Sequence, residues 1–286
     1  MGGLSINAHT ITAEQIARYG EHLREEERAP GTVENYLRNV DRFVFWLAGR
    51  AVTREKAVEW KEHLVSCRYA PATINGMLSA LNSFFSYFGW QECRVKALRV
   101  QRRAFRDPSR ELTREEYEHL IETARLLGRE RLALVLETIG ATGVRVSEVR
   151  YLTVEAARSG RAEISLKGKI RTILLPGKLC RKLLKYARKE KIASGEVFRT
   201  GGGKSLSRKQ IWSEMKNLCH HAGVEPSKVF PHNLRHLFAT VFYRACGDIV
   251  KLADVLGHSS IETTRIYLLT SGAEHIRTLD RLRLVC

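Results

Sequence analysis

The chain has 286 residues, 44% of them hydrophobic, which is enough to bury a substantial core and excludes a disordered tail. Its 48 lysine and arginine residues against 31 aspartate and glutamate residues give a formal charge of +17, and such a surplus attracts polyanions, nucleic acid foremost. The sequence has neither an apolar run long enough for a membrane helix nor a signal-peptide pattern, so we expect a cytoplasmic protein without membrane contact. Charge alone leaves open a basic protein of another kind, such as a ribosome-associated factor.

The cysteine pattern and the glycine-rich stretch argue against a bound cofactor. The six cysteines never form a C-x-x-C pair, so neither a zinc site nor a disulfide framework is indicated. The stretch GGGKS, residues 201–205, is not a phosphate-binding loop, because that motif requires glycine where this chain has Phe198. We therefore expect no metal and no cofactor.

Residues 1–98 read as a helical unit. A first helix opens at Thr12, and a second runs from Thr32, its expected N-cap, to Gly49 with one apolar stripe. Two further helices are predicted at 53–66 and 71–88. Four short helices of this kind predict a small bundle that needs no sheet.

Residues 99–111 form a basic segment that predicts an interdomain linker. It contains a proline and no helical apolar stripe. Its arginines are Arg99, Arg102, Arg103, Arg106 and Arg110. We expect these side chains to lie along a phosphate backbone, although a solvated connector would show the same composition.

Residues 112–286 form the second predicted domain. Helices return at its start, and residues 162–176 predict a β-hairpin because two runs of alternating Ile and Leu flank a Lys-Gly-Lys turn. Further helices are expected at 178–190, 207–222, 232–246, 248–256 and 260–270. The predicted fold class is thus mainly α with a small β-hairpin, in two domains.

The helix that begins near His232 has two different faces. At about 100° per residue, with His232 at zero, Leu237, Phe238 and Val241 fall on one side, whereas Arg235 and His236 fall on the other. Phe230-Pro231 precedes it, and proline suits the first turn, where free N–H groups favour an anion. The sequence therefore predicts a positive helix end that can receive something negative.

Three other stretches carry polar residues in suggestive positions. In ATGVRVSEVRYL, residues 141–152, a glycine turn delivers Arg145 at the start of a helix, with Glu148 one turn later and able to hold its guanidinium. The hairpin tip carries Lys167 and Lys169. Each of these residues, taken alone, also fits a surface ion pair or a solvated turn.

The third stretch is VLGHSSIETTRIYLL, residues 255–269. Gly257 is expected to end one helix, while Ser259 and Glu262 form a capping box for the next. His258 follows the glycine, and Tyr267 lies about two turns into the second helix. Taken singly, His258 fits a helix-end residue and Tyr267 fits a core aromatic.

The order of these pieces resembles the tyrosine recombinase/integrase family, which includes phage integrases and Xer-type resolvases. The order is T-G-x-R-x-S-E, a lysine hairpin, H-x-L-R-H, L-G-H-S and then a tyrosine nine residues after the histidine. The likeness covers nearly the whole chain, since the first helical unit resembles that family's SAM-like core-binding domain. It implies site-specific breakage and rejoining of DNA strands, without metal.

The resemblance assigns roles to these residues. Arg145 and Arg235 would stabilise the charge on the scissile phosphate with their planar forks of donors, and Tyr267 would attack the phosphorus to form a 3′-phosphotyrosine. Lys167, which precedes the turn glycine, would protonate the departing 5′-oxygen, and Lys169 is the second candidate.

The remaining polar residues would have supporting parts. His232 and His258 would hydrogen-bond the phosphate or handle the tyrosine proton, and Glu148 would brace the site. His236 fills the last place of H-x-L-R-H and either supports the site or only packs beside it.

The implied partners are double-stranded DNA with a specific recombination site and further copies of the chain in a DNA-bound tetramer. The apolar end segment, residues 272–286, would pass to a neighbouring copy, and accessory directionality proteins fit this class. Two other functions stay open: a type IB-like topoisomerase, and an inactive DNA-binding regulator. Within the recombinases, a compact Xer-type enzyme and a mobile-element integrase both fit, with a slight preference for the latter.

Overall fold

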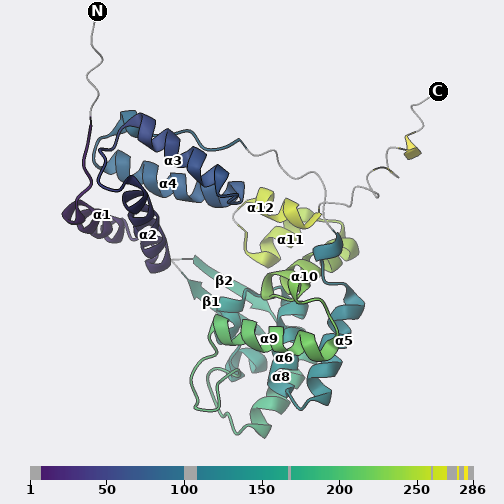
Figure 1. Ribbon diagram of the computed structural model, residues 1–286. Helices are drawn as coiled ribbons and strands as arrows, with labels where there is room; N and C mark the ends of the chain where they lie inside the picture. The colour runs from purple at the N-terminus through teal and green to yellow at the C-terminus, as the bar shows by residue number, and fades with distance from the viewer. Residues whose placement is uncertain are drawn as a thin grey trace, which may run out of the picture. The chain divides into compact units, whose positions relative to one another are not determined.

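The computed structural model of the protein describes residues 8–99, 108–166, 169–258, 260–268, 276 and 280–282. The chain forms two compact units, Met1–Arg102 and Arg103–Cys286 (Figure 1). Each unit contains hydrophobic clusters of its own. Within the described part of the chain, the helices are too short or too polar to span a membrane.

The first unit is a bundle of four α-helices, as predicted. Thr12 caps the first helix, with reciprocal hydrogen bonds between its backbone and side chain and those of Gln15. Tyr19, Phe43 and Phe84 are fully buried between the helices. The helices are α1 (Ala13–Glu25), α2 (Pro30–Leu47), α3 (Arg54–Ser66) and α4 (Pro71–Tyr87).

The expected start of the second helix at Thr32 is wrong. Helix α2 begins three residues earlier, with Ala29 as its N-cap and Pro30 in the first position. Proline is favoured there because its fixed φ matches the helix and its missing N–H would have had no partner. At the other end, Ala48 adopts a left-handed conformation, and Gly49 follows with φ +79°.

The segment after α4 is tied to the bundle by two asparagines. Asn82 donates to the Val95 carbonyl at 2.8 Å and accepts from its N–H at 3.0 Å. Asn75 makes the same pair of bonds with Leu98, at 3.0 and 2.7 Å. The backbone N–H and carbonyl groups of both Val95 and Leu98 are therefore satisfied by side chains of α4.

The second unit is helical around a central helix, α6, which contacts α5, α8, α9 and α10. Leu132, Val135, Leu136 and Ile139 of α6 are buried, as its position requires. The helices are α5 (Arg114–Leu126), α6 (Glu130–Thr142), α7 (Val154–Ser159), α8 (Gly177–Lys189), α9 (Arg208–Ala222), α10 (Pro231–Cys246), α11 (Ile249–Leu256) and α12 (Ile261–Arg265).

The predicted hairpin is present as strands β1 (Arg161–Leu166) and β2 (Lys169–Leu174), which pair antiparallel. The register places Ile164 opposite Arg171. Because side chains alternate between faces, positions 162, 164, 171 and 173 share one face. Ala162, Ile164 and Ile173 are buried on it. The fourth position of this inward face is therefore occupied by a charged residue, Arg171.

The last helices form a corner beside α10 (Figure 1). Gly257 ends α11 in the left-handed conformation, as predicted. The expected capping box of Ser259 and Glu262 is wrong, because Ser260 is the N-cap of α12 and accepts from the Glu262 N–H at 3.2 Å. Ser259 itself lies outside the described residues. After α12 the chain continues as a 3₁₀ turn, Ile266–Leu268, instead of the expected longer α-helix.

Candidate functional site

Arg145 and Glu148 lie together after the end of α6, as the sequence predicts. Arg145 precedes a 3₁₀ helix, Val146–Tyr151, and its N–H donates to Glu148 Oε2 at 2.8 Å. Its Nη1 donates to Glu148 Oε1 at 3.0 Å. The Glu148 side chain is 4% exposed and that of Arg145 is 41% exposed. The carboxylate is therefore a buried brace, while the guanidinium retains a face toward solvent.

A glycine turn makes this geometry possible. Gly143 ends α6 with φ +63°, and a Cβ atom built there would clash with the ring of Phe238 on α10. Its carbonyl accepts from Arg235 Nη1, which joins the turn to α10. A side chain at position 143 would push α10, which carries Arg235, away from the turn that precedes Arg145. This close packing therefore requires the glycine of T-G-x-R.

Arg235 is buried, contrary to its expected place on the open side of α10. It is 3% exposed, and its Nη2 donates to the Leu256 carbonyl at 2.7 Å and contacts His258 Nε2 at 2.9 Å. The α11–α12 corner covers this side of the helix and supplies those acceptors. Val241, expected in the core, is instead 43% exposed.

Arg235 stays positively charged although its side chain is buried. Burial and then the Arg145 cation lower the pKa of Arg235 to about 10, whereas a hydrogen bond with Tyr267 raises it. Even a pKa near 10 leaves the guanidinium charged at neutral pH. A buried arginine bonded mainly to carbonyl oxygens keeps an uncompensated positive charge, which favours an anion nearby.

His258 is held as a neutral imidazole. Since Arg235 has only N–H groups to offer, His258 Nε2 accepts, and Nδ1 must donate to Thr264 Oγ1 at 2.9 Å. Thr264 is fully buried on α12. Burial first, and then the Arg235 and Arg145 cations, lower the pKa of His258 to about 4. The tautomer is thus set by one partner from α10 and another from α12.

Tyr267 lies beside three histidine rings. The centre of its ring is 5.0 Å from that of His236, 5.9 Å from that of His258 and 6.0 Å from that of His232. It is 2% exposed and packs in a small cluster with Ala239, Leu252 and Leu256. Its hydroxyl bonds to Arg235. The phenol is therefore buried among polar rings and a guanidinium, not among aliphatic side chains alone.

His232 and His236 enter this cluster from the first two turns of α10. His232 is exposed to solvent on one side, while the rest of its ring is covered by the protein. This partial burial is the largest cause that lowers the pKa of His232, and the Arg235 and Arg145 cations lower it further. His236 contacts the Tyr267 ring edge-on, at an interplanar angle of 65°. The predicted polar side of the helix thus meets the tyrosine.

Sequence reasoning missed Arg171 as a site residue. Its Nη2 donates to Glu148 Oε2 at 2.5 Å, and its Nη1 donates to the Leu256 carbonyl. Burial lowers its pKa most, with Glu148 acting in the opposite direction. The signal that could have revealed it is the strand alternation, which puts a cation on the buried face with Ile164 and Ile173.

The predicted hairpin lysines and linker arginines are described only in part. Lys167 lies outside the described residues, and Lys169 is described only through its backbone, as the first residue of β2. Arg99 and Arg110 are exposed. Arg102, Arg103 and Arg106 lie outside the described part of the chain.

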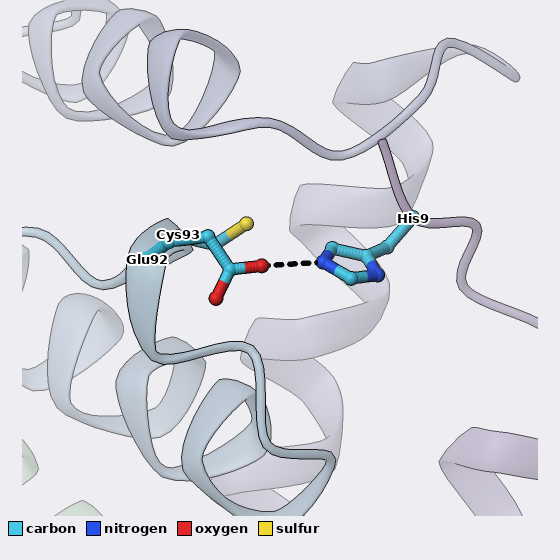
Figure 2. Close-up of side chains that lie close together, drawn as sticks. All are labelled: His9, Glu92 and Cys93. Carbon is cyan, nitrogen blue, oxygen red and sulfur yellow. Dashed lines mark hydrogen bonds and ion pairs between the residues drawn. The ribbon is translucent and has the colours of Figure 1, made fainter. Parts of the chain in front are cut away.

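A group of metal-ligand type lies elsewhere, in the first unit. Figure 2 shows the His9 ring facing Glu92, with Cys93 next to it, and their ligand atoms lie within 4.8 Å of one another. His9 Nε2 and Glu92 Oε1 are 2.6 Å apart, and the His9 ring stacks on Trp90 at 4.3 Å. Burial raises the pKa of the Cys93 thiol to about 11. The ion pair and the ring stack account for this group as a brace that joins the first described residues to the segment following α4.

Comparisons with known proteins agree with this architecture. The model of the Phage integrase family matches residues 110–273, and that of the Phage integrase, N-terminal SAM-like domain, matches residues 16–92. A lambda integrase tetramer bound to a Holliday junction has the same fold, with a TM-score of 0.73 at 16% identity over 92% of this chain and 78% of that one. The predicted fold class is confirmed.

Relatives are similar over almost their whole length. A tyrosine recombinase XerA from Pyrococcus furiosus is 30% identical over 284 residues, which cover 96% of each chain. A tyrosine recombinase XerC from Roseiflexus castenholzii is 30% identical over 282 residues, 89% of this chain and 88% of its own. The chain therefore belongs to the phage integrase family of tyrosine recombinases.

Proposed function

We propose that the protein is a site-specific DNA recombinase that cuts and rejoins DNA strands through a 3′-phosphotyrosine intermediate. One observation carries the proposal: the Tyr267 phenol bonds to the buried Arg235 cation and lies against His232, His236 and His258. A tyrosine that served the core alone would not need a buried guanidinium at its oxygen. The similarity to tyrosine recombinases of the XerA and XerC type points the same way.

The phosphate would be held by Arg145 and Arg235. Arg145 is braced by Glu148 yet 41% exposed, so its fork can reach a ligand from outside. Arg235 is fixed by the Gly143 and Leu256 carbonyls. Two guanidinium groups held before the ligand arrives can stabilise charge on the nonbridging oxygens without reorganisation in the transition state.

The nucleophilic step would form a bond from the Tyr267 oxygen to phosphorus and break the bond from phosphorus to the 5′-oxygen. In the structure the Tyr267 hydroxyl bonds to Arg235. A phosphate that contacts both the hydroxyl and the guanidinium must therefore enter between them. His232 and His258 would hydrogen-bond the phosphate or accept the phenolic proton. Their lowered pKa values keep both rings neutral near pH 7, the form that can accept one.

The departing 5′-oxygen would take its proton from the hairpin, from Lys167 or from Lys169 as second candidate. Cations placed around a lysine lower the cost of losing its proton, and the arginines of the site supply such charge. Arg171 is the member of that group carried by β2 itself. The phosphotyrosine bond retains the energy of the broken bond, so the mechanism requires neither metal nor nucleotide.

The partners would be double-stranded DNA with a specific recombination site and further copies of the chain. The basic segment with Arg99, Arg102, Arg103, Arg106 and Arg110 would follow the phosphate backbone, and residues 272–286 would dock on a neighbouring copy in a tetramer. The likeness in fold to lambda integrase, which forms a tetramer on a Holliday junction, supports this assembly. Accessory directionality proteins would act with the assembled tetramer.

Two finer alternatives are less favoured. Type IB-like relaxation or an inactive regulator would not account for similarity to tyrosine recombinases along almost the entire chain. The similarity to XerA and XerC supports an Xer-type resolvase over a mobile-element integrase. Relaxation of a plasmid without the selected site would support the topoisomerase.

A suicide substrate tests the proposal. Duplexes selected from a random library by affinity for the protein are nicked near the cleavage point, so that the strand end diffuses away and the covalent complex accumulates. We expect a denaturation-resistant protein–DNA adduct with the unmodified protein and none with Tyr267→Phe at equal DNA affinity. Selected duplexes that bind but yield no adduct at any nick position would refute it.

A further inference from the structure

Arg171 joins three segments of the second unit that the chain order keeps apart. It belongs to β2, its Nη2 bonds to Glu148 at 2.5 Å, and its Nη1 bonds to the Leu256 carbonyl at the end of α11. The side chain is 17% exposed. One guanidinium therefore ties the hairpin to the 3₁₀ helix after α6 and to the α11–α12 corner.

Both acceptors of Arg171 are shared with the proposed phosphate ligands. Glu148 also accepts from the backbone and side chain of Arg145. The Leu256 carbonyl also accepts from Arg235 Nη2 at 2.7 Å. Without Arg171, Glu148 would still accept from Arg145, and the Leu256 carbonyl would still accept from Arg235, so these two arginines would stay held.

The corner is shaped around Arg171. Gly257 has φ +63°, and a Cβ atom there would lie 2.5 Å from Arg171 Cδ and from its Nη1. Real Cβ contacts of that length essentially do not occur, so a larger residue would push the arginine or the turn away. The glycine of L-G-H thus permits this contact as well as the left-handed turn.

Arg171 is also close in sequence to the hairpin lysines. Lys169 is two residues before it on β2, and strand alternation gives both positions the same face of the hairpin. Lys167 is two residues further back. Fixing position 171 therefore fixes β2, which carries Lys169 and begins two residues after Lys167.

We propose that Arg171 is a positioning residue that holds β2, and with it the hairpin lysine, against the Arg145–Glu148 brace and the α11–α12 corner. This inference rests on the proposed function. Nη1 and Nη2 of Arg171 each have an acceptor inside the protein, and those acceptors belong to the elements that hold Arg145 and Arg235. Its effect on the reaction passes through the lysine.

The test compares two scissile linkages. The first is the ordinary phosphodiester, whose 5′-oxygen must be protonated as it leaves. The second carries sulfur at the 5′-bridging position, where the tyrosine oxygen bonds to phosphorus, the phosphorus–sulfur bond breaks and the electron pair stays on sulfur. A thiolate leaves without a proton, because a thiol has a pKa of only about 8.5. The second substrate therefore removes the need for the lysine.

Arg171→Gln should lower single-turnover cleavage of the phosphodiester by about 100-fold, since a general acid contributes 10²–10⁴-fold and a misplacement of about 1 Å costs roughly 10². On the sulfur substrate the same variant should cleave within about threefold of the unmodified protein. Arg171→Lys keeps the positive charge but not the planar pair of donors. It should cleave the phosphodiester at a rate between those of Arg171→Gln and the unmodified protein. The control is Arg161→Gln on the exposed start of β1, with both rates unchanged.

Three results would overturn the inference. Arg171→Gln and Arg171→Lys could both cleave the phosphodiester at the unmodified rate. The two variants could be equally slow on both substrates, which would place the defect at the phosphate. They could also lose DNA affinity and cleavage in parallel, as a merely structural role predicts. If the unmodified protein forms no adduct with either substrate, the proposed function itself fails, and that outcome is distinguishable from the other three.

Discussion

Replacing His258 with glutamine should remove a loss of stability that the protein suffers on acidification. The ring is neutral because Nε2 accepts from Arg235 at 2.9 Å and Nδ1 donates to Thr264 at 2.9 Å. A proton on Nε2 would face the guanidinium and end that hydrogen bond. Burial, and after it the Arg235 cation, accordingly lower the pKa of His258 to about 4.

The size of the effect follows from the two protonation equilibria. The unfolded chain, with a histidine pKa of 6.5, binds the proton more readily than the folded chain, with a pKa of about 4. The free energy of unfolding that the neutral His258 ring contributes is therefore fully present above about pH 6.5, and it is lost as the pH falls toward about 4. Between about pH 7.5 and about pH 5 the loss from this one ring is about 2 kcal/mol.

Urea unfolding at these two pH values measures the loss, with hydrogen–deuterium exchange of α6 peptides reporting on the second unit alone. The unmodified protein should lose about 2 kcal/mol more than His258→Gln between about pH 7.5 and about pH 5. His119→Gln, at an exposed position, is the matched control and should behave as the unmodified protein. An equal loss in His258→Gln and the unmodified protein would refute a neutral His258 held by Arg235.

Two further substitutions probe the brace and the corner. Glu148→Gln should cost about 3 kcal/mol of unfolding free energy, because it removes the buried partner of Arg145 and Arg171; a loss below about 1 kcal/mol in urea unfolding would contradict the brace. Gly257→Ala should slow suicide-substrate cleavage at least about 10-fold more than Gly247→Ala. Both glycines have positive φ, +63° and +66°, but a Cβ at Gly247 meets nothing within 4 Å, so equal effects would argue against the contact with Arg171.

The parts of the site that sequence could predict are the local ones. Arg145 and Glu148 are three residues apart, and the glycine turn before them fixes the direction of both. The hairpin and most helix bounds followed from alternation and capping residues in the same way. Local patterns suffice where the interacting groups belong to one turn.

The parts that could not be predicted depend on contacts between distant segments. A helical wheel assigned Arg235 to the open side of α10, because it treats polar residues as solvated. In the protein that side is covered by the α11–α12 corner, and a carbonyl 21 residues away satisfies the guanidinium. Arg171 and Glu148 are 23 residues apart, and His9 and Glu92 are 83 apart. No periodicity along the chain connects such pairs.

The covalent attachment point tests the central claim most directly. After reaction with the suicide substrate and nuclease digestion, trypsin should release residues 266–277 as one peptide, since Arg265 precedes it and Arg277 ends it. We predict a nucleotide phosphate on the Tyr267 side chain of that peptide by tandem mass spectrometry, and no adduct in Tyr267→Phe. A nucleotide on a different residue, or an adduct that persists in Tyr267→Phe, would contradict the account.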